Sequence, residues 1–178
     1  MPDNKLPLIT QTVERATAFV FGSPLLTNIH RAVVAEAIVA SALEPEWEWC
    51  AGDYSAFDFR HVSGARLEVK QSASLQSWNR HTLKPSKCSF DIAERTGRWE
   101  DVDRWISERG RNADVYLFCH HPIVSSEADH RDASQWRFFP VKAADLPPGQ
   151  KKMGLNAVKL LSSECNFQSL ADRLRLLI

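Results

Sequence analysis

The segment 58–71 constrains the fold more than any other part of the chain, because charged and apolar residues alternate on both sides of a glycine, Gly64. Side chains of a β-strand point to alternate faces of a sheet, so Glu68 and Lys70 share one face while their apolar neighbours point into the core. Glycine tolerates the unusual backbone angles that a hairpin loop requires. We therefore predict two antiparallel strands that turn at Gly64, with Asp58 on the first of them.

The length of the loop decides whether three charged side chains share a face. A three-residue loop at 63–65 would place Asp58 opposite Lys70 and Arg60 opposite Glu68. A two-residue turn would shift the pairing by one position and send Asp58 to the other face, because strand side chains repeat every two residues. We predict the odd-numbered loop, with Asp58, Glu68 and Lys70 on one face.

Two carboxylates and an amine that converge at a sheet edge suit a hard divalent cation. Mg²⁺ takes oxygen ligands, keeps several waters and usually binds only one or two protein carboxylates. Mn²⁺ is expected to substitute for it. A lysine beside the ion can orient or deprotonate an attacking water, or stabilise negative charge on a phosphate. The alternative is an ordinary ion pair between Glu68 and Lys70 on a solvated strand face.

These residues resemble the PD-(D/E)XK phosphodiesterase superfamily, which includes restriction endonucleases and Holliday-junction resolvases. Its motif is an aspartate, a variable spacer across a hairpin, and then (Asp/Glu)-x-Lys; here it is Asp58, nine intervening residues and Glu68-Val69-Lys70. The resemblance implies a metal-dependent nuclease in which Asp58 and Glu68 hold Mg²⁺ and Lys70 positions or activates the attacking water. Gln71 follows the lysine directly, as a polar residue does in several branches of the family, although strand alternation points it away from Lys70.

A helix is predicted at 29–43, apolar nearly all round, as in helices packed deep against a sheet. Glu36 interrupts its apolar surface, and an unpaired buried carboxylate would protonate or find a cation. Many members of the superfamily carry an acidic residue on the first core helix, so the resemblance makes Glu36 a third metal ligand, direct or through water. The alternative is an ion pair with Arg31 or Arg60. Arg31 and its neighbour His30 are expected at the surface of the first helical turn.

The order of the expected elements agrees with the resemblance. After the helix come a strand at 46–50, the two strands of the hairpin, a helix at 100–109 and a buried strand at 113–119. This order is the αβββαβ core that the resemblance to restriction endonucleases implies. Asp53, in the turn that precedes the hairpin, is a rival for the hairpin acid, but aspartates in turns usually cap their own backbone.

Further elements complete an α/β fold with a mixed central sheet. A helix is expected from Ile9 to about Gly22, and an additional edge strand and C-terminal helical segments are expected at 135–141, 155–161 and 167–177. We expect one domain, residues 1–178, with its core at about 28–142 and a C-terminal helical extension at about 150–178.

The connection 72–98 is long, polar and irregular, and such loops are often functional. Basic side chains could neutralise phosphates there while an aromatic ring packs on a sugar or an unstacked base. The alternative is a solvated loop whose tryptophans cover the edge of the core. The candidate nucleic-acid contacts are Trp78, Arg80, His81, Lys84 and Lys87.

The composition excludes several classes of protein. No apolar run is long enough to cross a membrane, and the N-terminus lacks the pattern of a secretory signal. The four cysteines are widely spaced and form no Cys-x-x-Cys pair, which is typical of reduced thiols in a cytoplasmic protein. The spacing of the cysteines and histidines matches no standard structural zinc site. The formal net charge of zero gives no sign of nucleic-acid binding, so a basic surface would have to be local.

The function implied by the resemblance is hydrolysis of phosphodiester bonds in nucleic acid, with DNA as the expected substrate. Cleavage of both strands of a duplex would favour a homodimer. The superfamily also contains inactive members, so the alternative is a module that binds nucleic acid or a protein without cutting. A structural subunit of a larger assembly is a third hypothesis, based on the small size, the neutral charge and an amphipathic C-terminus.

Overall fold

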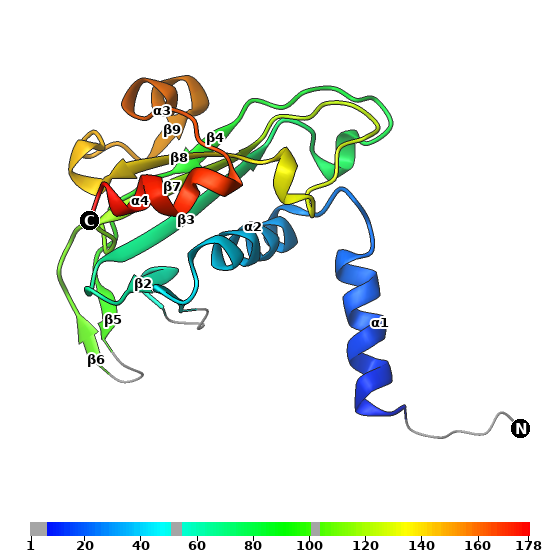
Figure 1. The fold of residues 1–178 in the computed structure, drawn as a ribbon, viewed down its shortest axis with the longest axis horizontal. Coiled ribbons are helices and arrows are strands. Elements are labelled where there is room, and N and C mark those ends of the chain that lie inside the picture. Colours follow the sequence, from blue (N-terminus) through cyan, green and yellow to red (C-terminus); the bar gives the residue numbers. More distant parts are fainter. Residues whose placement is uncertain (1–6, 51–54, 101–103) are drawn as a thin grey trace, which may run out of the picture.

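The computed structural model describes residues 7–50, 55–100 and 104–178. A five-stranded mixed sheet forms its centre, in the order β1-β2-β3-β7-β8 (Figure 1). Only β3 and β7 run parallel within this sheet; its other neighbouring strands are antiparallel. The strands are β1 (Trp47–Trp49), β2 (Phe59–His61), β3 (Arg66–Ala73), β7 (Val115–His121) and β8 (Arg137–Lys142).

Helices and two small strand pairs surround this sheet. The helices are α1 (Ile9–Phe21), α2 (Asn28–Leu43), α3 (Leu155–Leu161) and α4 (Leu170–Arg175). The strand pairs are β4 (Ser89–Asp91) with β9 (Lys152–Gly154), and β5 (Arg98–Glu100) with β6 (Arg104–Ile106). Single 3₁₀ turns are η1 (Ser77–Asn79), η2 (Ala133–Gln135), η3 (Ala143–Asp145) and η4 (Phe167–Ser169). The mixed α/β class and the mixed central sheet are confirmed, as is the position of β8 at the edge of the sheet.

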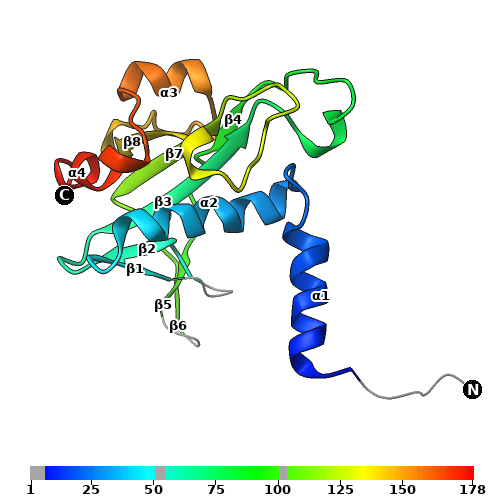
Figure 2. The ribbon, with the colours of Figure 1, turned by 45° about the vertical axis from the view of Figure 1, so that its right-hand side comes forward.

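The two faces of the sheet carry separate hydrophobic cores, with α2 on one side and α3 on the other (Figure 2). Alternate residues of β7 serve the two cores: Leu117 and Cys119 belong to the core with α2 and α4, while Tyr116 and Phe118 belong to the core with α3 and the β4–β9 pair. Every residue of β7 is buried. Burial on both faces explains why this strand reads as an almost continuous apolar run.

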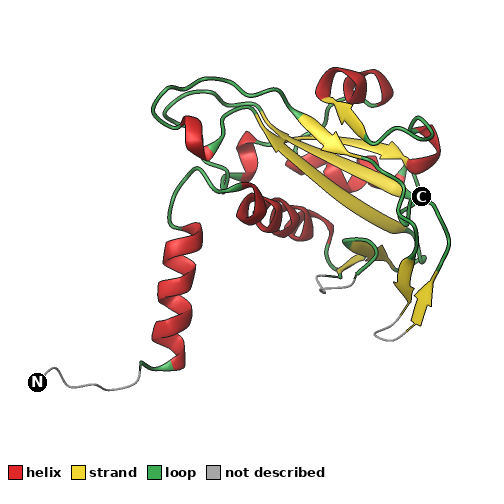
Figure 3. Ribbon diagram, turned by 180° about the vertical axis from the view of Figure 1, so that it is seen from behind, coloured by secondary structure: helices red, strands yellow, loops and turns green. Residues whose placement is uncertain are grey.

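The predicted helix at 100–109 is wrong. Residues 101–103 lie outside the described residues. The residues on either side of them form the antiparallel strands β5 and β6, a hairpin apart from the central sheet (Figure 3). Trp99 pairs with Trp105 across these strands, and their rings lie 5.4 Å apart edge to face. Such cross-strand aromatic pairs stabilise a hairpin, which outweighs the helical spacing of the apolar residues.

The hairpin changes the topology of the core. In the described part of the chain, the connection from β3 to the parallel strand β7 contains η1, β4 and the β5–β6 pair, and no α-helix. The αβββαβ order is therefore met in its first four elements and in its last strand, but not in its second helix. The chain has a mixed α/β fold, and the restriction-endonuclease-like core remains a prediction.

The two N-terminal helices have the expected bounds but not the expected surroundings. α1 has no buried residue and extends away from the rest of the molecule (Figure 1). In α2, one face is buried and the other is not, because Ile29 and Val33 are exposed. Arg31, expected at the surface, is only 1% exposed. No helix among the described residues has the length and apolar character that a membrane span requires.

His130 connects three segments beside α2. Its Nδ1 accepts the backbone N–H of Leu26 over 3.0 Å, so Nε2 carries the proton and donates to the carbonyl of Leu75 over 3.1 Å. Burial, followed by the nearby His121 and Arg31, lowers the pKa of His130 to about 3. Only the neutral ring can make both hydrogen bonds, since protonation of Nδ1 removes the acceptor.

We predict that the free energy of unfolding falls as the pH decreases below about 6.5, the ordinary pKa of histidine. The unfolded chain then binds a proton that folded His130 does not, so stability is lost towards the folded pKa of about 3. His130 alone should account for roughly 2 kcal/mol between pH 7 and pH 5. Urea titrations of the wild type and of His130→Gln check this. An equal loss in both proteins would contradict it.

Candidate active site

The turn between β2 and β3 has the predicted odd number of residues but begins one residue earlier than expected. The N–H of His61 donates to the carbonyl of Ala65 over 2.8 Å and closes a three-residue loop, 62–64, in place of 63–65. Gly64 lies in this loop with a φ of 92°, a left-handed conformation that favours glycine. The glycine therefore has the role predicted for it.

The earlier turn changes the register of the hairpin by two residues. Arg60 pairs with Arg66 and not, as expected, with Glu68. Continuing this register places Asp58 beside Glu68 and not opposite Lys70, so the expected pairing is wrong. A shift of two residues keeps every side chain on its face, because the strand period is two. Asp58, Glu68 and Lys70 therefore still lie together.

Asp58 lies where β2 and β3 part. The paired residues of the two strands end at Phe59 and Leu67, and beyond them the Oδ2 atom of Asp58 accepts the backbone N–H of Val69 over 2.6 Å. The carboxylate thus takes the place that a strand partner would fill. Burial raises the pKa of Asp58 to about 7, and the neighbouring Glu68 adds to the rise.

Glu68 and Glu36 approach Asp58 from different elements. Glu68 forms an ion pair with Lys70 two residues further along β3. Glu36 reaches the site from α2, and its Oε2 atom accepts the indole N–H of Trp49 over 3.1 Å. Burial raises the pKa of Glu36, and the hydrogen bond from Trp49 opposes this rise. Glu36 therefore contacts Trp49 and forms neither of the ion pairs considered for it, with Arg31 or with Arg60.

Two hollows open on these groups. The first, of about 400 Å³, is lined by Glu36, Asp58 and Lys70 together with Asn28 and Gln71. The second, of about 370 Å³, is also lined by Asp58 and adds Glu68. Asp58 is therefore the residue at which the two hollows meet, and all four predicted acidic and basic groups line at least one of them.

Gln71 points towards α2, as its position in the strand predicts. The Nε atom of Arg31 donates to the Oε1 atom of Gln71 over 2.6 Å, and its two other nitrogens donate to Gln76 and Asn28 over 3.0 and 2.9 Å. Burial lowers the pKa of Arg31 to about 10. Arg31 was expected on the surface; it is instead the buried group that fixes Gln71 at the rim of the first hollow.

The predicted nucleic-acid contacts lie elsewhere. All five follow the C-terminal end of β3, on η1 or the loop after it, and all are exposed; they are Trp78, Arg80, His81, Lys84 and Lys87. None of them lines either hollow. The basic and aromatic loop at 78–87 is therefore exposed and lines neither hollow, whereas residues 89–91 and 95–98 of the same connection line the hollows at Asp58.

Several residues that line the hollows were not identified from the sequence. Ser89, Asp91 and Lys152 reach the first hollow from the β4–β9 pair, which joins segments far apart in the chain. Arg95 and Asn112, with the residues of the β5–β6 hairpin, line the second. Short strands of three residues carry no periodic signal, so the sequence did not show that these positions come together at the site. Asp53, the rival acid, lies outside the described residues.

The donor chemistry of the site fits Mg²⁺. The described residues include no three His, Cys, Asp or Glu side chains arranged to hold a metal ion as they stand. Magnesium needs only one or two carboxylates and completes its coordination with water. Burial is the main cause of the raised pKa of Asp58, and the negative charge of Glu68 adds to it, so a cation between the two carboxylates would stabilise their charged forms. Asp58 and Glu68 would hold it.

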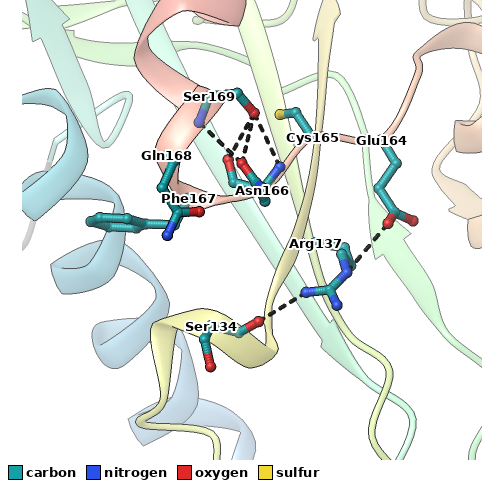
Figure 4. Close-up of a pocket in the computed structure, with 8 residues that line it drawn as sticks. All are labelled: Ser134, Arg137, Glu164, Cys165, Asn166, Phe167, Gln168 and Ser169. Atoms are coloured by element: carbon teal, nitrogen blue, oxygen red, sulfur yellow. Dashed lines mark hydrogen bonds and ion pairs between the residues drawn. The ribbon is translucent and has the colours of Figure 1, made fainter.

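A third hollow, of about 400 Å³, lies between β8 and η4 (Figure 4). Its polar groups bind one another: Arg137 forms an ion pair with Glu164 over 3.3 Å, and Asn166 and Ser169 cap each other. Burial raises the pKa of the Cys165 thiol to about 11, so it is a weak nucleophile. The charged groups of this hollow are therefore paired with each other, and its thiol is not activated.

Comparison with known proteins assigns the chain to no family. No family model matches its sequence, and no curated protein matches it. The resemblance to PD-(D/E)XK nucleases therefore rests on Asp58, Glu68 and Lys70, on Glu36, and on where the structure places them.

We predict that Asp58→Asn stabilises the protein at pH 8 in the presence of a chelator. Asparagine keeps the oxygen that accepts the Val69 N–H and removes the crowded charge. Since folding raises the pKa of Asp58 from 3.8 to about 7, stability that is fully present below pH 3.8 is lost as the pH rises from there to about 7. The stabilisation by the variant should therefore be roughly 2–3 kcal/mol larger at pH 8 than at pH 5. Equal stability at both pH values would contradict the crowding.

Proposed function

We propose that the protein is a metal-dependent nuclease that hydrolyses phosphodiester bonds in nucleic acid, with DNA as the expected substrate. The observation that carries the proposal is the meeting of Asp58, Glu68 and Lys70 on neighbouring strands, joined by Glu36 from α2. Two carboxylates for a cation and an amine for the attacking water are the groups that such a reaction requires.

Each group has a separate task in this proposal. Asp58 and Glu68 hold Mg²⁺, which when bound would supply the positive charge that stabilises the phosphate and the leaving oxygen. Lys70 exchanges its ion pair with Glu68 for a contact with the attacking water or a phosphate oxygen. The Trp49 N–H binds Oε2 of Glu36, so Oε1 is left to hold a water of the site.

Gln71 and Arg31 act on the shape of the site. Gln71 also donates from its Nε2 atom to the carbonyl and side-chain oxygens of Asn28, both over 3.1 Å. With Arg31 on its other end, the amide joins the start of α2 to β3, directly beside Lys70. This brace fixes the distance between the helix that carries Glu36 and the strand that carries Glu68.

A second candidate function is that of a non-catalytic module in an assembly. The observation in its favour is α1, which has no buried residue and exposes apolar side chains such as Ile9, Val13 and Phe19. A partner that covers this helix would explain those side chains without any chemistry at Asp58. Cleavage assays separate the two functions, because only a nuclease requires Lys70.

We predict that Lys70→Ala lowers Mg²⁺-dependent cleavage of DNA by about 10²–10⁴-fold, the usual effect of losing a group that acts on the attacking water. Lys142→Ala, which removes an exposed lysine at the end of β8, is the matched control and should cut like the wild type. Gel assays with single- and double-stranded DNA in Mg²⁺, Mn²⁺ and chelator give the rates. Cleavage that persists in Lys70→Ala, or in chelator, would contradict the proposal.

A further inference from the structure

The second hollow continues into another one. The smaller hollow, of about 180 Å³, shares Arg98 and Asn112 with the second hollow, as the second shares Asp58 with the first. The three hollows therefore form one tract that leads from Lys70, past the β5–β6 hairpin, to the segment between β6 and β7. Asn112, where the second and the small hollow meet, is only 8% exposed, so it is packed into the fold.

Arginine dominates the far end of this tract. Arg66, Arg98, Arg109 and Arg111 all line the small hollow, and Glu108 is the only acidic one among the described residues that line it. Four arginines thus line one small space in a chain whose formal net charge is zero. Guanidinium binds phosphate through paired hydrogen bonds, so the small hollow has the chemistry of a phosphate site.

A phosphate in the small hollow would compete with the carboxylate partners of three of these arginines. Arg111 donates to three backbone carbonyls and is held in place by them. Two of the ion pairs have one mostly exposed side chain each, Arg109 at 75% beside Glu94 at 24% and Glu108 at 66% beside Arg98 at 25%, and pairs that are open to solvent contribute little to stability. The pairs are Arg66 with Asp114, Arg98 with Glu108, and Arg109 with Glu94.

Two tryptophans line the middle of the tract. Trp99 and Trp105 are 39% and 47% exposed, although they pack against each other edge to face. Their position, on a wall shared with Asp58 and Glu68, is next to the proposed catalytic groups. Exposed aromatic rings beside a basic groove are the usual means of binding bases of a single strand, because every base has a face that stacks.

Resting on the nuclease proposed above, we infer that this tract binds a single-stranded stretch of the nucleic-acid substrate. A base stacks on the Trp99–Trp105 pair, and a phosphate of the same strand enters the arginine hollow. Bases of an intact duplex are already stacked on one another, so the rings favour an unpaired strand over a duplex. The tract replaces the loop around Trp78 as the surface that selects the substrate.

Binding of a fluorescent oligothymidine, measured by anisotropy, tests the inference. Ca²⁺ replaces Mg²⁺ so that the strand is not cut, and a hairpin duplex serves as competitor. Trp105→Ala should weaken binding by about 5–100-fold, the loss expected for one base stack. Arg109→Ala should weaken it less and lower the slope of log K against log salt by about 0.7, the value for one phosphate contact of a single strand.

Matched variants keep the test sharp. Trp78→Ala and Arg15→Ala remove an exposed tryptophan and an exposed arginine away from the tract and should bind like the wild type. Trp105→Phe keeps an aromatic ring in the hairpin and should retain most of the binding, which separates loss of stacking from loss of folding. Equal affinity of Trp105→Ala and the wild type, or equal weakening by Trp78→Ala, overturns the inference.

The two proposals can fail separately. Cleavage that depends on Lys70, together with strand binding that ignores Trp105 and Arg109, leaves the nuclease and overturns the tract. Strand binding that depends on Trp105 and Arg109, without any metal-dependent cleavage, supports the tract and overturns the nuclease.

Discussion

The hydrogen bond from the Val69 N–H to the carboxylate of Asp58 is the contact on which the site depends. It lies at the point where β2 leaves β3, and a buried carboxylate there satisfies a backbone donor that would otherwise lose its strand partner. The same bond fixes an acid beside Glu68, where two negative charges repel each other. The fold therefore holds Asp58 in a position that its charge disfavours, which is typical of functional sites.

The remaining parts of the site follow from how β3 is used. Its even-numbered residues, Glu68 and Lys70, face one side of the sheet, while Gln71 faces α2 and is held by Arg31. One strand thus supplies the charged groups and the brace that positions the helix carrying Glu36. The β5–β6 hairpin comes between β3 and β7 in the chain, although these two strands are neighbours in the sheet. Its tryptophan and arginine side chains line the second hollow beside Asp58.

Local alternation was sufficient to predict the hairpin, and long-range pairing was not visible in the sequence. An odd-numbered loop places the side chains of Asp58, Glu68 and Lys70 on one face of the sheet. They stay on that face although the loop begins one residue earlier than predicted, since a two-residue change of register keeps every side chain on its face. The region around Trp99 and Trp105 has helical spacing, yet the two rings pair across strands. Arg31 shows the same limit, because its partners Gln71 and Gln76 are distant in the chain.

Calorimetric titration of the protein with Mg²⁺ tests the central claim most directly. If Asp58 and Glu68 hold the ion, binding at pH 7 must displace the proton that Asp58 partly retains, because its pKa is about 7. The heat should then depend on the ionisation enthalpy of the buffer, and Asp58→Asn should abolish binding and proton release together. An absence of Mg²⁺ binding, or binding of equal strength to Asp58→Asn, would contradict the account.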